Sequence, residues 1–258
     1  MQSERNKLNS IEKALSILKV FDSNRPYWGV REISSHLGFS PSTVQRLLQT
    51  LKDYSYVEQN PETRQYRLGN IYFQFIFTLQ NASPLTETAQ LFMRQLLSKT
   101  QETVHLNVID GTERLCIDSI ESSQSLKASM PIGSRSPLYA GASSKCLLAY
   151  SESDFVKQYL KTTKIKAITA NTIVDKHRLL EDLEQIKSQG FAESLGERNP
   201  GLGSFSSAIL GRRGEVLASV SLAIPEIRFQ VDEHRKLCIS ELTKIAKEIS
   251  KAMGSLGS

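Results

Sequence analysis

Four polar side chains recur at helical spacing between residues 42 and 49, and their chemistry suits the edges of nucleic-acid bases. An arginine pairs with O6 and N7 of guanine, and a glutamine pairs with N6 and N7 of adenine. The positions follow the i, i+3, i+4, i+7 rule for one helix face: Ser42, Gln45, Arg46 and Gln49. Apolar residues at the same spacing would hold another face against a core: Val44, Leu47, Leu48 and Leu51. One anchored face and one free face are what a DNA-recognition helix needs.

Side chains beside this helix could contact the phosphate backbone. Ser40 and Pro41 open the helix, with serine as the N-cap and proline at the first helical position, where its missing N–H costs nothing. Ser40, Ser42 and Thr43, together with the first-turn N–H groups, can hold a phosphate. Arg64 lies in a polar turn and could add a backbone or minor-groove contact. A polar outer face is often only a solvated face, so the surrounding elements decide the interpretation.

The surrounding elements predict a winged helix-turn-helix over residues 1–69. A first helix starts at the Asn9-Ser10 cap and carries apolar residues at helical spacing: Ile11, Ala14, Leu15, Leu18 and Phe21. A second helix covers residues 30–37 and stops at Gly38. Two short strands, residues 56–59 and 65–68, flank the turn-forming residues 60–64. Helix, helix-turn-helix and hairpin in this order are typical of a winged DNA-binding domain.

Residues 70–83 are predicted to form a linker helix. Apolar and aromatic residues crowd this segment, which ends at Asn81-Ala82-Ser83-Pro84: Ile71, Tyr72, Phe73, Phe75, Ile76 and Phe77. A helix this hydrophobic cannot stand alone in water, so we expect it to pack on a neighbour, such as its copy in a second subunit.

Residues 84–258 are predicted to form a second, α+β domain. Strand-like stretches cover residues 103–109, 114–120, 205–210 and 216–223, with turns at Asp110-Gly111 and at residues 211–214. Helical patterns cover residues 84–100, 143–150, 175–189 and 230–253. Strands in the middle with helices at both ends favour an α+β arrangement.

Length and composition fit a two-domain globular protein with a polyanionic partner. The chain has 258 residues, 40% apolar residues and a formal net charge of +5. Residues 1–80 hold ten Lys and Arg against seven Asp and Glu, so the charge density is higher in the shorter N-terminal part. Three widely spaced cysteines indicate reduced thiols, and no apolar run approaches the ~20 residues of a membrane helix. With no signal peptide at the start, we expect a cytoplasmic protein without a membrane partner.

No residue pattern predicts a catalytic site, a metal site or a cofactor. The four histidines lack metal-ligand spacing, and the motifs of nucleophilic serines and phosphate-binding loops are absent. His105 alternates with Val104 and Leu106 on a strand, where a satisfied imidazole is the simplest interpretation. A rival hypothesis remains open, in which a small-molecule enzyme or sensor carries the winged helix to bind another protein.

Two segments of the second domain could line a ligand pocket. Ser143 and Ser144 open a helix after the small residues 140–142, so free N–H groups there could hold a carboxylate. Ser219 and Ser221 alternate with apolar neighbours and therefore share one strand face. Serines on an inward face need partners, which either neighbouring protein groups or a polar ligand could supply.

Several ordered motifs resemble the IclR family of transcription regulators. The N-terminal pieces are NSIEKALSILKVFD, VREISSHLGFSPSTVQRLLQTL and YVEQNPETRQYRLG. The C-terminal pieces are ETVHLNVIDGTERLCIDSIES, PIGSRSPLYAGASSKCLLAY and GFAESLGERNPGLGSFSSAILGRRGEVLASVSLAIPEIRF. The resemblance runs from about Asn9 to Met253. It implies a winged helix-turn-helix that binds operator DNA, a GAF-like effector domain, a homodimer or dimer of dimers, and control of a nearby catabolic operon.

The resemblance also implies which residues contact the effector. Carried over by motif, they are Ala142, Ser143, Leu202, Ser204, Ser221 and Ala223. The chain departs from the family at Ser194, where a carboxylate is common, at Ser204, where a cysteine is common, and at Ala223, where a second serine is usual. No Arg or Lys stands at these points, so the sequence predicts a small anion or polar-headed molecule held by neutral donors. Its identity, and whether it releases a repressor or assists an activator, stay open.

Overall fold

The computed structural model describes residues 9–22, 24–81 and 83–255. Predictions for Ala82 in the linker and for the domain ends at residues 1–8 and 256–258 lie outside the described residues. Two compact units make up the chain, Met1–Ala82 and Ser83–Ser258.

Three helices open the N-terminal unit: α2 (Ser10–Leu18), α3 (Val30–Leu37) and α4 (Pro41–Asp53). A reciprocal capping box starts α2, because the Glu12 N–H donates to Asn9 Oδ1 over 2.9 Å and the Asn9 N–H donates to Glu12 Oε2 over 2.7 Å. Gly38 ends α3 with φ at 72°, a left-handed conformation that glycine adopts without strain. Local signals therefore define these helices before any packing is considered.

A short wing completes the winged helix-turn-helix. Its strands β1 (Val57–Gln59) and β2 (Tyr66–Leu68) pair antiparallel, and Trp28 adds a bridge to Tyr66. The core of this unit gathers residues from the helices, the loops and the wing: Ile17, Val20, Phe21, Trp28, Ile33, Phe39, Val44, Leu47, Leu48, Val57 and Tyr66. The predicted winged fold is confirmed.

The structure buries part of the apolar set predicted for the first helix, because Phe21 is in the core and Ala14 and Leu18 pack against it. Ile17 is fully buried, whereas Ile11 and Leu15 are 72% and 53% exposed. Apolar residues cover more than one face of this short helix, so spacing alone does not select the face that meets the core.

Helix α5 (Ile71–Asn81) follows the wing. Tyr72 packs edge-on against Tyr56, with ring centroids 6.0 Å apart. The outer part of α5 leaves large apolar side chains in solvent, among them Phe73 and Phe77, which are 72% and 70% exposed.

A six-stranded antiparallel sheet forms the centre of the C-terminal unit, in the order β5-β4-β3-β8-β7-β6. The strands are β3 (Thr103–Asp110), β4 (Glu113–Ile120), β5 (Arg135–Pro137), β6 (Ala192–Leu195), β7 (Leu202–Leu210) and β8 (Val216–Pro225). The four long strands match the predicted ones, while the short edge strands β5 and β6 were not predicted. Because β3 and β8 are central neighbours, residues 103–107 and 219–223 face each other across the sheet.

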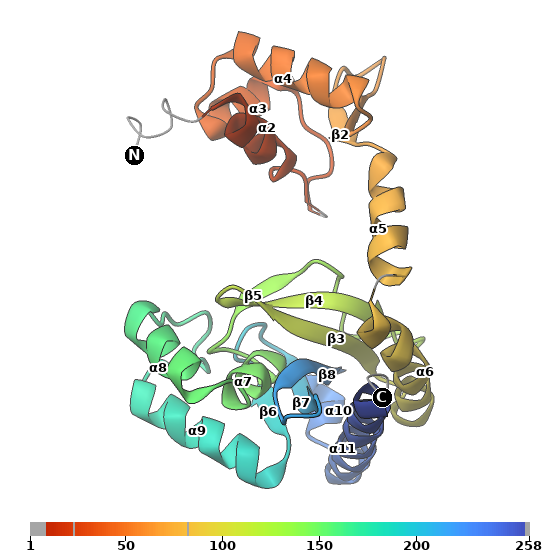
Figure 1. The fold of residues 1–258 in the computed structure, drawn as a ribbon, viewed down its shortest axis with the longest axis vertical. Coiled ribbons are helices and arrows are strands. Elements are labelled where there is room, and N and C mark those ends of the chain that lie inside the picture. Colours follow the sequence, from red (N-terminus) through yellow and green to blue (C-terminus); the bar gives the residue numbers. More distant parts are fainter. Residues whose placement is uncertain (1–8, 23, 82, 256–258) are drawn as a thin grey trace. The chain divides into compact units, whose positions relative to one another are not determined.

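Helices cover both faces of this sheet (Figure 1). On one face lie α6 (Pro84–Thr100) and α11 (Asp232–Ser255), whose apolar residues share a core with Leu106, Phe205 and Leu222. On the other face, α7 (Ala142–Ala149), α8 (Ser153–Thr162) and α9 (Lys176–Gln189) form a second core. A single turn, α10 (Glu226–Phe229), joins β8 to α11. The α+β class is confirmed.

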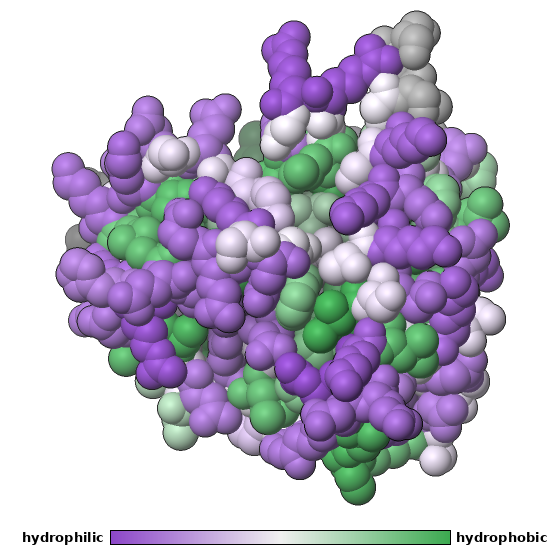
Figure 2. All heavy atoms as spheres, turned by 90° about the horizontal axis from the view of Figure 1, so that it is seen from below, coloured by the Kyte–Doolittle hydropathy of each residue, from purple (hydrophilic) through white to green (hydrophobic). Residues whose placement is uncertain are grey.

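The surface of the molecule is mixed in polarity. Figure 2 shows a face on which polar residues predominate and apolar residues form small, separate groups. No helix of the described ranges is long and apolar enough to span a membrane.

Candidate functional site

The outer face of α4 is free for a partner. Ser42, Gln45, Arg46 and Gln49 are all exposed, while Val44, Leu47 and Leu48 on the inner face are buried. Periodicity alone therefore placed the two faces correctly, and Leu51 lies at their boundary, partly buried.

Two of the exposed side chains have protein partners that orient them. Gln45 Nε2 donates to the hydroxyl of Tyr66 over 3.3 Å, which ties the recognition face to the wing. Gln49 Nε2 donates to Asp53 Oδ1 over 2.7 Å along the helix. No acceptor for the Arg46 guanidinium is found in the described part of the chain, so its donors are open to a base edge.

A group of hydroxyls lies at the N-terminus of α4. Ser40 Oγ accepts the Thr43 N–H over 3.2 Å and lies 3.1 Å from Ser42 Oγ and 2.8 Å from Thr43 Oγ1. Hydroxyls and N–H groups at the positive end of a helix suit a phosphate oxygen. These are the three residues for which the sequence predicts phosphate contacts.

Arg64 lies in the wing turn with φ at 58°, in the left-handed region. Asn60 shapes the turn, since its Oδ1 accepts the N–H groups of Glu62 and Thr63 over 2.8 and 3.0 Å. The Arg64 side chain is exposed. It is thus positioned to reach a DNA backbone beside the groove that α4 would enter.

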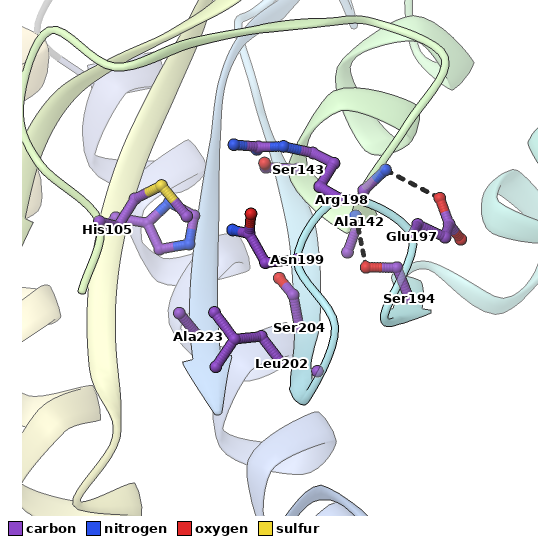
Figure 3. Close-up of a pocket in the computed structure, with 13 residues that line it drawn as sticks. His105, Ala142, Ser143, Ser194, Glu197, Arg198, Asn199, Leu202, Ser204 and Ala223 are labelled. Carbon is purple, nitrogen blue, oxygen red and sulfur yellow. Dashed lines mark hydrogen bonds between the residues drawn. The ribbon is translucent and has the colours of Figure 1, made fainter. Parts of the chain in front are cut away.

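The C-terminal unit holds a pocket of about 420 Å³, open mouth included, between the start of α7 and the sheet. Five of the six residues predicted to contact an effector line it: Ala142, Ser143, Leu202, Ser204 and Ala223 (Figure 3). Residues outside the prediction also line it, among them His105, Met130, Glu197, Arg198 and Asn199.

Two N–H groups at the start of α7 already have acceptors. Gly141, at φ 90°, donates its N–H to Glu197 Oε2 over 2.8 Å. The Ala142 N–H donates to Ser194 Oγ over 3.1 Å. Glu197 also accepts from the buried Lys145 Nζ over 2.6 Å. The N–H groups of Gly141 and Ala142 are therefore engaged within the protein, and a ligand carboxylate at the next N–H groups of this turn, those of Ser143 and Ser144, stays a prediction.

Ser221 lies beneath the pocket rather than in its lining. It is fully buried, its Oγ lies 2.8 Å from Ser206 Oγ, and it accepts from Asn107 Nδ2 over 3.2 Å. Asn107 Nδ2 also donates to the carbonyl of Ser219 over 3.3 Å. The serines of β8 thus hold Asn107, and a direct contact of Ser221 with an effector stays a prediction.

Arg198 and Arg114 are cationic residues near the pocket that the sequence analysis did not single out. Arg198 lines the pocket from the loop between β6 and β7, and burial lowers the pKa of its guanidinium. Arg114 is fully buried on β4, and burial lowers its pKa to about 10. Both stay charged at neutral pH. The sequence predicts a site of neutral residues, and only tertiary packing brings these two arginines to it.

Other features of the described residues offer no reactive centre. Burial raises the pKa of Cys116 to about 11 and the pKa of Cys146 and Cys238 to about 12, so all three remain protonated thiols. No group of three or more His, Cys, Asp or Glu in the described ranges could hold a metal ion.

Comparisons with known proteins match both units. A family model described as "IclR helix-turn-helix domain" matches residues 10–61, and one described as "Bacterial transcriptional regulator IclR C-terminal" matches residues 77–251. The HTH-type transcriptional regulator KdgR of Escherichia coli (strain K12) is 34% identical over 255 residues, which cover 98% of this chain and 96% of KdgR.

Two solved structures show the same fold over nearly the whole chain. The Thermotoga maritima IclR superimposes with a TM-score of 0.79 at 28% identity, over 95% of this chain and 99% of that chain. An IclR homolog from Microbacterium hydrocarbonoxydans, complexed with 4-hydroxybenzoate, gives a TM-score of 0.82 at 18% identity, over 95% of this chain and 99% of that chain. The second likeness concerns the fold alone.

Proposed function

The chain belongs to the IclR family of bacterial transcription regulators, and we propose from this premise that it reads operator DNA with α4 and the wing. Residues 1–69 would be the DNA-binding domain, 70–83 the linker helix and 84–258 the effector domain. The rival hypothesis of an enzyme with a protein-binding winged helix is rejected, because the relatives are transcription regulators. A regulator of transcription works beside the bacterial chromosome, so this one would act in the cytoplasm.

The exposed, polar face of α4 is the observation that carries DNA binding. Arg46 and Gln45 would pair with base edges, and Gln49 and Ser42 would extend the contact along the groove. Ser40 and Thr43 at the helix start, and Arg64 on the wing, would contact phosphates and fix the register. Every one of these side chains except the half-buried Thr43 is exposed.

The pocket of the C-terminal unit supports a small polar effector that controls a catabolic operon. Ala142, Ser143, Leu202, Ser204 and Ala223 line it, with Ser221 in the layer beneath. A distant structural relative carries 4-hydroxybenzoate, which shows that this fold accommodates a small carboxylate. Its ligand need not be the ligand of this chain.

Homodimerisation through α5 supplies the second DNA half-site. Phe73, Phe77 and Leu79 are each about 70% exposed, which is unfavourable in water and favourable against a second copy. Two-fold symmetry in the protein would match an inverted repeat in the operator. Light scattering on the wild-type chain and a Phe73→Ser, Phe77→Ser variant tests this, and a wild-type monomer with full operator affinity would refute it.

A salt titration of binding to the DNA upstream of the gene tests the proposed function. A regulator contacting 6–10 phosphates loses roughly 10³–10⁵ in affinity between 50 and 200 mM salt, whereas a protein-binding winged helix shows no such loss.

A thermal-shift screen of small carboxylates, sugar acids and aromatics tests effector binding. A ligand at 100 times its Kd stabilises the folded protein by about 2.7 kcal/mol, which raises the unfolding temperature.

Filling the pocket tests its role separately from DNA binding. Ser204→Phe should abolish the response to the effector found in that screen and leave DNA affinity unchanged, because the DNA-reading face lies in the other unit. Ser188→Phe on the exposed side of α9 is the matched control. An undiminished ligand response in Ser204→Phe would place the effector elsewhere.

A further inference from the structure

Polar groups around the pocket lack protein partners. His105 lines the pocket and is fully buried, yet its Nε2 has no hydrogen-bond partner in the described residues. The same holds for Nη2 of the fully buried Arg114. The Arg198 guanidinium, which extends across the pocket in Figure 3, forms no hydrogen bond or ion pair within the described ranges. His105 and Arg114 are fully buried, where a polar group without a partner is costly, while Arg198 is half-buried and open to the pocket. These groups indicate what a ligand must supply.

The hydrogen bonds of Asn107 determine which nitrogen of His105 carries the proton. Arg114 Nη1 lies 3.2 Å from Asn107 Oδ1 and can only donate, so the atom facing it must be the amide oxygen. His105 Nδ1 lies 3.1 Å from the same oxygen and therefore carries the hydrogen. Nε2 is left with a lone pair, and it can only accept a hydrogen bond.

His105 keeps this acceptor at physiological pH. Burial lowers the pKa of its imidazole to about 3, and the positive charges of Arg114 and Arg198 act in the same direction against the hydrogen bond to Asn107. The group that satisfies Nε2 must therefore be a donor, such as a hydroxyl.

Arg198 needs a hydrogen-bond acceptor, whereas His105 Nε2 needs a donor. The adjacent carboxylate, Glu197, is already bound by Lys145 Nζ at 2.6 Å and by the Gly141 N–H at 2.8 Å. Arg114 has no ion-pair partner among the described residues and adds a second positive charge near His105 and Arg198. A carboxylate satisfies a guanidinium better than any neutral acceptor, because two charge-assisted hydrogen bonds form in parallel.

We propose that the pocket binds a small hydroxycarboxylate, whose carboxylate pairs with Arg198 and whose hydroxyl donates to Nε2 of His105. The assignment rests on the proposed function, in which this pocket is the effector site. Ser143 and Ser204 supply further hydroxyls, while Leu202, Ala223 and Met130 face the carbon skeleton. A plain fatty acid leaves Nε2 unsatisfied, and a neutral polyol leaves Arg198 unpaired.

Three six-carbon probes separate these requirements by isothermal titration of the full chain. D-gluconate carries a carboxylate and a hydroxyl on each of its other carbons, hexanoate carries only the carboxylate, and D-glucitol carries only hydroxyls. D-gluconate should bind about tenfold or more tighter than either of the others, because hexanoate leaves the buried His105 Nε2 without a donor and D-glucitol leaves the half-buried Arg198 without a carboxylate. Hexanoate binding as tightly as D-gluconate would overturn the proposal.

Two variants assign the contacts. Arg198→Gln should weaken D-gluconate binding about 10- to 100-fold, and Arg178→Gln, at an exposed position of α9, should not weaken it. His105→Leu should weaken D-gluconate about tenfold and spare hexanoate, a difference between ligands that general damage to the fold would not produce. Unchanged D-gluconate affinity in Arg198→Gln would overturn the carboxylate assignment.

The tautomer can be read without any ligand. Imidazole ¹⁵N chemical shifts of the wild-type chain should show the His105 proton on Nδ1, and a proton on Nε2 would overturn the hydroxyl assignment.

The operator-binding assay separates the class of ligand from its role as effector. If D-gluconate binds as expected but leaves operator affinity unchanged, the ligand class stands and the effector role fails. If neither D-gluconate nor 4-hydroxybenzoate binds at millimolar concentration, the ligand class fails, whatever the operator assay shows.

Discussion

Polar side chains are solvated on the outer face of α4 but buried and paired beside the pocket at α7. Arg46 on α4 is exposed and without a protein acceptor in the described residues, which costs little because water solvates it. Beside the pocket, Lys145 and Glu197 are buried and joined to each other. An open donor is therefore ordinary on α4, whereas beside the pocket a missing partner identifies a ligand contact. The predictions below test this contrast.

The largest expected effect follows the loss of a buried ion pair. Glu197→Ala leaves Lys145, which is 1% exposed, with Asp182 as its remaining carboxylate at 2.9 Å. It should destabilise the C-terminal unit by about 3 kcal/mol. The control is Glu58→Ala, which breaks an exposed 2.8 Å pair with Arg67 on the wing and should cost at most about 1 kcal/mol.

Urea unfolding can follow the two units separately. Trp28 is the only tryptophan of the chain and lies in the core of the N-terminal unit, so its fluorescence reports that unit. Far-UV circular dichroism follows both. Equal destabilisation by Glu197→Ala and Glu58→Ala would break the contrast between a buried and a solvated site.

The same contrast explains what the sequence could predict. The recognition face of α4 follows from a cap, a proline and one helical period, all within residues 40–51. The pocket combines the β6–β7 loop, the start of α7 and three central strands, so Arg198 and the partners of Asn107 could not be found from spacing. The resemblance supplied five residues that do line the pocket, but it did not supply the charged residues there: Ala142, Ser143, Leu202, Ser204 and Ala223.

Short elements escaped prediction for a related reason. Strands β5 and β6 have only three and four residues, too few to show a period, and they exist because β4 and β7 offer them an edge. In the first helix the predicted Ala14, Leu18 and Phe21 do meet the core, but so does Ile17, whereas the predicted Ile11 and Leu15 are exposed. Local patterns determine that an element forms, and packing selects which of its faces is buried.

DNA readout should show the next largest effect. Arg46→Ala and Gln45→Ala should each weaken operator binding by about 1–3 kcal/mol and relax base preference at one position. Arg178→Ala, an exposed arginine of the other unit, is the control and should change nothing. Competition binding against operators with single base changes measures both quantities. A folded double variant with wild-type affinity would remove α4 from the interface.

The pH dependence of stability should distinguish the two units at a smaller scale. His105 stays neutral in the folded chain down to about pH 3, whereas an unfolded histidine gains a proton near pH 6.5. Between these values the unfolded state binds more protons, so stability falls as the pH falls. From pH 6.5 to 5 the loss should be about 1–2 kcal/mol in the C-terminal unit. His105→Leu should flatten this slope, and an unchanged slope would contradict a buried, neutral imidazole.

The smallest expected effect belongs to Arg64, and the backbone there determines the substitution to use. Its φ of 58° disfavours alanine, so an alanine variant would mix lost charge with a strained wing. Arg64→Asn removes the charge and tolerates the left-handed conformation. If Arg64 contacts one phosphate, the variant should lose about 1 kcal/mol or less, lower the salt slope by about 1 and keep its base preference. A changed base preference with an unchanged salt slope would instead mean that the wing reads sequence, as α4 does, and that the solvated face extends beyond the helix.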